Sequence, residues 1–127
     1  MAAALWVALG GALGSVARLK LGGWAALAYP DWRFPLGTFL VNVLGCLAIG
    51  LLAGAGERPG LLSHEAKLFL FTGILGGFTT FSAFGLETVA LLKRGDLLVA
   101  CSYAGLSVVA GILAVYLGFA IGSVASR

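Results

Sequence analysis

The side chains that could do chemistry in this sequence are polar groups set inside long apolar segments. Most of them donate hydrogen bonds: Asn42, Thr79, Thr80, Ser82, Tyr103, Ser107 and Arg18. Glu87 is the only acid within the apolar segments. Amides and hydroxyls can donate hydrogen bonds and arginine only donates. A cation path more often shows carboxylates or a ring of carbonyls. The set therefore favours an anion as the ligand.

The simplest alternative is that each hydroxyl bonds back to a carbonyl of its own helix. That interpretation suits a single serine or threonine. It suits Asn42 less well, because an amide within the stretch GTFLVNVLG has more groups to satisfy. Asn42, one turn after Thr38, is therefore the strongest single candidate for a functional group.

The stretch GGFTTFSAFGLE, residues Gly76–Glu87, predicts an interruption in a membrane helix. Glycine costs about 1 kcal/mol in a helix interior relative to alanine, and threonine roughly half that or more. Two glycines and two threonines together make a weak point. Lipid offers no donors to the carbonyls freed there, so a partner chain or a bound cation would have to satisfy them.

Three phenylalanines recur within this stretch at every third position, at Phe78, Phe81 and Phe84. This spacing places them on one face of a helix. Such rings usually face lipid or the core, but an aromatic ring also has an electropositive edge that attracts an anion. The periodicity does not distinguish these uses. Because Phe78 lies inside the predicted interruption, only Phe81 and Phe84 are candidates for the pathway.

The elements that must position these groups are four apolar helices. The chain of 127 residues is 61% hydrophobic and 10% charged, whereas soluble domains are about a quarter charged. The predicted spans are Ala2–Tyr29, Phe34–Gly54, Ala66–Leu92 and Leu97–Val124, and each exceeds the roughly 20 residues that cross a membrane. The connections are short. We expect one all-α domain over residues 1–127, a multi-pass protein of the cell inner membrane with its third helix broken.

The charge distribution fixes orientation weakly. The net charge is +3, without the basic cluster that nucleic acid requires. The face with both termini holds Arg58, Lys67 and Arg127, and the other holds Arg33, Lys93 and Arg94, joined by Arg18 and Lys20 if the first helix ends near them. So small a bias orients a chain poorly. An equal mixture of orientations would permit an antiparallel dimer.

Four motifs, taken in order, resemble the CrcB/Fluc family of fluoride channels. They are GGALGSVAR ending at Arg18, PLGTFLVNVLG over Pro35–Gly45, GGFTTFSAF from Gly76, and the four-residue spacing of Tyr103, Ser107 and Gly111. The resemblance covers all four spans. Ala83 stands where the family motif has threonine, and Gly111 stands where some members have serine or threonine.

The resemblance implies an antiparallel, dual-topology homodimer in the lipid bilayer, with two fluoride pathways and passive fluoride export that relieves fluoride toxicity. A central structural sodium ion, not transported, would be held by the backbone carbonyls of Gly76 and Thr79. Asn42 would donate to the permeating fluoride, and Phe81 and Phe84 would be the ring pair that lines the path. A polar track would comprise Thr80, Ser82, Tyr103 and Ser107, and Arg18 would lie near an aqueous vestibule.

Two other classes stay open from the residues alone. A small structural or assembly protein would use the interruption to dock a partner helix. A small multidrug-type transporter has similar size, but the first two spans contain none of the acids that proton coupling needs. An enzyme is not expected, because no nucleophile–base pair or metal-ligand cluster stands out. Glu87 could pair with Lys93, Arg94 or a second chain, donate as a neutral acid, or act as a charge near a helix end.

Overall fold

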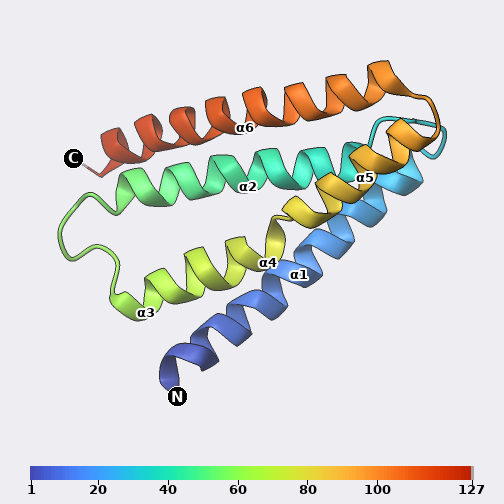
Figure 1. Ribbon diagram of the computed structural model, residues 1–127. Coiled ribbons are helices and arrows are strands. Elements are labelled where there is room, and N and C mark those ends of the chain that lie inside the picture. The colour runs from blue at the N-terminus through green and yellow to red at the C-terminus, as the bar shows by residue number, and fades with distance from the viewer. Residues whose placement is uncertain (127) are drawn as a thin grey trace.

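The computed structural model describes residues 1–126, so Arg127, which entered the charge count, lies outside the described residues. The helices are α1 (Ala2–Ala28), α2 (Leu36–Ala55), α3 (His64–Lys67), the π-helical η1 (Leu68–Leu75), α4 (Gly76–Phe78), α5 (Phe81–Lys93) and α6 (Leu97–Ala125) (Figure 1). No strand occurs within residues 1–126. Four stretches are long and apolar enough to cross a membrane: α1, α2, His64–Lys93 and α6. The prediction of an all-α, four-span protein is confirmed.

The helix boundaries follow local signals and fall within two residues of those predicted. Ser63 caps α3, where its hydroxyl accepts from the N–H of Ala66 at 3.1 Å. Gly95, at φ +81°, follows α5 and takes a conformation that favours glycine. Asp96 precedes α6 but does not cap it with its side chain, because its carboxylate pairs with Arg33 at 2.6 Å. Helix α1 continues through Arg18 to Ala28, so the first helix does not end there.

Two tightly packed helix pairs make up most of the fold. Helix α2 lies along α6, and α1 lies along η1 and α4 (Figure 1). Glycines let the backbones meet in both pairs: a Cβ on Gly118 would lie 2.3 Å from the carbonyl oxygen of Leu47, and one on Gly14 would lie 2.1 Å from that of Ile74. Contacts between α2 and η1 are sparse by comparison. The candidate site lies in the space between the two pairs.

The third span is interrupted between α4 and α5 (Figure 1). Thr79 has ψ 157°, and Thr80 has φ −151° and ψ 112°, so both residues are extended. The interruption lies within the glycine- and threonine-rich stretch that predicts it. The π-helical turns of η1 end where α4 begins, three residues before the interruption, and such turns often accompany functional sites in helices.

The small buried core lies where α5 turns into α6. Leu91, Ala100 and Tyr103 form it, and the rings of Phe34 and Phe84 pack against it. Elsewhere many large apolar side chains of α1 and α6 are exposed. Exposed apolar surface of this extent suits helices that face lipid or a partner chain.

Candidate anion pathway at the helix interruption

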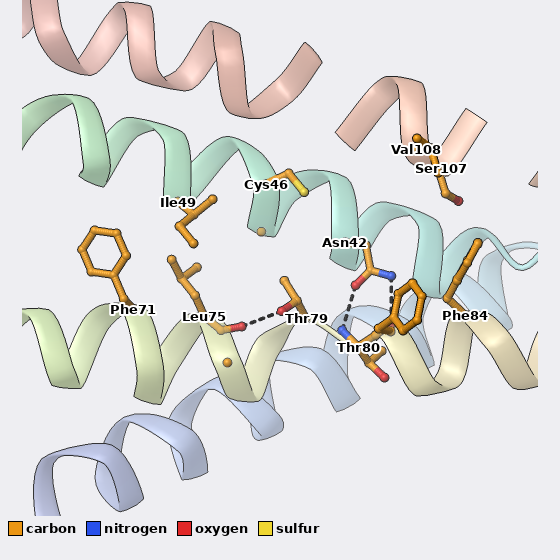
Figure 2. Close-up of a pocket in the computed structure, with 13 residues that line it drawn as sticks. Asn42, Cys46, Ile49, Phe71, Leu75, Thr79, Thr80, Phe84, Ser107 and Val108 are labelled. Carbon is orange, nitrogen blue, oxygen red and sulfur yellow. Dashed lines mark hydrogen bonds between the residues drawn. The ribbon is translucent and has the colours of Figure 1, made fainter. Parts of the chain in front are cut away.

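A cavity of about 390 Å³ lies between α2, the interrupted third span and α6. It brings together most of the predicted site residues, since its lining includes Asn42, Gly76, Thr79, Thr80, Phe81, Phe84 and Ser107. Figure 2 shows hydrogen-bonding groups toward one end, and Ile49, Phe71 and Leu75 toward the other. Ser82 and Arg18 line a second, smaller cavity that shares Thr80 with the first. Tyr103 lines neither of these two cavities.

The amide of Asn42 holds the backbone of Thr80 at the interruption. Its Nδ2 donates to the carbonyl oxygen of Thr80 at 3.0 Å, and its Oδ1 accepts from the N–H of Thr80 at 2.8 Å (Figure 2). An amide nitrogen carries two hydrogens, so one N–H remains beyond this pair. The interpretation that Asn42 needs partners outside its own helix is therefore correct.

The hydroxyls on the cavity wall differ in whether they already form hydrogen bonds within residues 1–126. Thr79 Oγ1 donates to the carbonyl of Leu75 at 2.8 Å, which is a bond back to its own helix. Thr80 Oγ1 accepts from the N–H of Ala83 at 3.1 Å and lies 3.4 Å from Ser82 Oγ. Ser107 Oγ is buried and has no hydrogen-bond partner within residues 1–126. The Ser107 hydroxyl is thus a donor at the cavity wall that the described residues leave unused.

The rings of Phe81 and Phe84 lie together at the start of α5. Their centroids are 5.6 Å apart and their planes meet at 36°. Phe84 also packs on Tyr103, with centroids 5.2 Å apart, whereas the side chain of Phe81 is 84% exposed. Phe78, which the sequence analysis set aside, lies near Gly45 instead and is not part of the cavity lining.

Glu87 is held by two hydroxyl groups from neighbouring helices. Thr38 Oγ1 on α2 donates to Glu87 Oε1, and the Tyr103 hydroxyl on α6 donates to Glu87 Oε2, both at 2.7 Å. Both oxygens of the Glu87 carboxyl group therefore meet hydroxyls, and Glu87 forms no ion pair with Lys93 or Arg94 within residues 1–126. The ion pair within residues 1–126 joins Arg33 and Asp96 instead. Sequence reasoning missed this cluster, although the polar Thr38 one turn before Asn42 was a signal for it.

Arg18 reaches the interruption from α1. Its Nη1 donates to the carbonyl oxygen of Thr79 at 3.3 Å, and its side chain lines the smaller cavity with Thr38 and Ser82. A guanidinium group on this wall makes the smaller cavity electropositive. That setting is compatible with an entrance for anions.

The carbonyls of Gly76 and Thr79 have both lost their helical donors. In a continuous helix the Thr80 N–H would bond the Gly76 carbonyl, but here it bonds Asn42. The Ala83 N–H would bond the Thr79 carbonyl, but here it bonds the Thr80 hydroxyl. Within residues 1–126 there is no group of three or more His, Cys, Asp or Glu side chains placed to hold a metal.

Four spanning helices, an interrupted third span and a cavity lined with uncharged donors define a small multi-pass membrane protein with a hydrogen-bonding path. The family described as "CrcB-like protein, Camphor Resistance (CrcB)" matches residues 5–119, and the chain belongs to that family.

Curated relatives extend over most of this chain. A protein of Methylobacillus flagellatus is 53% identical over 113 residues, which cover 89% of this chain and 88% of the relative. One of Novosphingobium aromaticivorans is 48% identical and covers 95% and 96%. One of Chloroflexus aurantiacus is 47% identical and covers 93% and 93%. All three relatives carry the name "Fluoride-specific ion channel FluC".

Proposed function

We propose that this chain is a fluoride-selective channel that lets fluoride leave the cell passively and so relieves fluoride toxicity. The observation that carries the proposal is the cavity wall at the interruption, where uncharged donors stand beside a pair of rings. The Ser107 hydroxyl has no hydrogen-bond partner within residues 1–126, and Asn42 has a second N–H. The names of the curated relatives support fluoride as the ion.

Such a wall suits a small anion that must shed water and still move on. Hydroxyl and amide donors replace part of the hydration shell, and among residues 1–126 no fixed positive charge lines the larger cavity to trap the ion. The rings of Phe81 and Phe84 add electropositive edges that attract an anion weakly. Binding is then favourable enough for entry and weak enough for release.

The pathway is completed, in this proposal, by a second copy of the chain in antiparallel orientation. The exposed ring of Phe81 and the open side of the cavity leave room for a partner's helices to close the path. The weak charge bias of the loops agrees with insertion in both orientations. Two copies would form two fluoride pathways.

The carbonyls of Gly76 and Thr79 would hold a structural sodium ion between the two copies. Neutral oxygens at helix ends suit such a cation. Gly76 is exposed, and a Cβ built on it meets nothing closer than 3.8 Å, so its surroundings are open. Thr79 shares its carbonyl with Arg18, but a carbonyl oxygen has two lone pairs. The ion would supply positive charge that ties the interrupted helices of the two copies together.

Fluoride efflux from liposomes tests this proposal. Purified protein is reconstituted, and efflux is started with valinomycin so that potassium balances the charge. Phe81→Ile removes the ring at the cavity mouth and is expected to abolish the flux. Phe119→Ile makes the same change on α6, outside the cavity lining, and is the matched control that keeps it. Undiminished flux in Phe81→Ile would overturn the pathway.

A further inference from the structure

We infer that Asn42 is a positioning residue that holds the third span open and so keeps the carbonyls of Gly76 and Thr79 out of the helical ladder. The sodium part of this inference rests on the proposed function, whereas the structural part does not. The Asn42 amide would then have two roles, because it lies on the proposed anion pathway and also shapes the proposed cation site.

The geometry resembles one rung of an antiparallel β-ladder. A single side-chain amide bonds both the N–H and the carbonyl of Thr80, at 2.8 Å and 3.0 Å (Figure 2). Two opposed bonds to one residue fix its backbone in the extended conformation that Thr80 adopts. In a continuous helix the Thr80 N–H would donate to the Gly76 carbonyl, but here it donates to Asn42.

Weak helix propensity cannot keep the interruption open by itself. An unpaired backbone group in apolar surroundings costs more than the propensity penalty of a threonine. Without an outside partner, the Thr80 N–H would gain by returning to the Gly76 carbonyl. Asn42 removes that gain because its Oδ1 accepts from the Thr80 N–H. In the same way, the Thr80 hydroxyl accepts from the Ala83 N–H, which would otherwise donate to the Thr79 carbonyl.

The sequence of α2 is built for this contact. Gly45 lies almost one turn after Asn42, and a Cβ on it would lie 2.2 Å from Thr79 Cγ2. Only glycine lets α2 lie directly against the interruption, and this brings the short side chain of Asn42 within reach of Thr80. The motif spacing of Asn42 and Gly45 therefore has a positioning role as well as a place on the pathway.

Amide hydrogen exchange on the intact protein in detergent tests the inference without relying on flux. In the unsubstituted protein the Thr80 amide should exchange more slowly than those of Phe81 and Ser82, because first-turn N–H groups of a helix lack helical partners. Asn42→Ala should let the helix close, so exchange at Phe81 and Ser82 should slow by about tenfold or more as their N–H groups gain the carbonyls of Gly77 and Phe78. Asn42→Asp keeps an acceptor oxygen for the Thr80 N–H and should leave exchange at Phe81 and Ser82 as fast as in the unsubstituted protein.

Thr38→Val is the matched control. It removes a side-chain hydrogen bond from the same helix one turn away, to Glu87, and leaves the interruption untouched. Exchange at Phe81 and Ser82 should stay within about twofold of the unsubstituted protein. The inference is overturned if Asn42→Ala leaves exchange at Phe81 and Ser82 equally unchanged. It is also overturned if the Thr80 amide of the unsubstituted protein exchanges as fast as that of Phe81.

Thermal midpoints in sodium and in choline chloride separate this inference from the proposed sodium site. Sodium should raise the midpoint of the unsubstituted protein and of Phe81→Ile, and Asn42→Ala should lose that increase. Slower exchange at Phe81 and Ser82 in Asn42→Ala, with no sodium effect in any variant, would contradict the sodium site and leave the role of Asn42 intact. A full sodium effect in Asn42→Ala would contradict the link between Asn42 and the carbonyls.

Discussion

Replacing Tyr103 by phenylalanine removes one hydroxyl and keeps the ring, so it isolates the bond to Glu87. The hydroxyl donates to Glu87 Oε2 at 2.7 Å from a side chain that is 0% exposed. The ring would keep its contacts with Phe34 and Phe84 at 5.3 Å and 5.2 Å. Removing one partner of a buried hydrogen bond costs about 1–3 kcal/mol. We expect the free energy of unfolding to fall by about that amount.

The assay is unfolding in mixed micelles, followed by circular dichroism as a denaturing detergent is added. Tyr116→Phe is the matched control, since Tyr116 lies on the same helix, is 74% exposed and forms no hydrogen bond within residues 1–126. Its free energy of unfolding should change by less than about 0.5 kcal/mol. Equal effects of the two substitutions would refute the argument that Tyr103 and Glu87 tie α6 to α5.

Two further predictions concern packing and orientation. Gly118→Ala should destabilise the protein by about 1–3 kcal/mol in the same assay, because its Cβ would lie 2.3 Å from the carbonyl oxygen of Leu47. Gly105→Ala on the same helix meets nothing within 4 Å and should not destabilise it. Equal stability of these variants would contradict the close contact of α2 and α6. A protease site at the N-terminus should be cut from both sides of intact vesicles, and cutting from one side alone would refute the antiparallel dimer.

The spans and the interruption were predictable because their causes are local. Apolar length sets a membrane helix, and proline, glycine and serine mark its ends, so each boundary fell within two residues. Glycine and threonine lower helix propensity wherever they occur, which located the extended residues at Thr79 and Thr80. The residue types on the cavity wall were also readable, since polar groups in apolar spans are few.

The pairing of those polar groups was not predictable from a single sequence. Thr38 and Glu87 are 49 residues apart, and Arg18 and Thr79 are 61 apart. Which pairs meet depends on how the helices pack, which is a property of the whole fold. Asn42 illustrates the limit. Its type and depth marked it as functional, but only the packing of α2 against the interruption shows that its amide bonds Thr80.

The most direct test of the central proposal compares fluoride with chloride in one liposome experiment. Vesicles that contain the purified protein are loaded with either potassium salt, and efflux is measured after valinomycin is added. We expect rapid fluoride efflux, and chloride efflux no faster than from vesicles without protein. Fluoride efflux no faster than from empty vesicles would contradict the channel, and equal efflux of the two anions would contradict its selectivity.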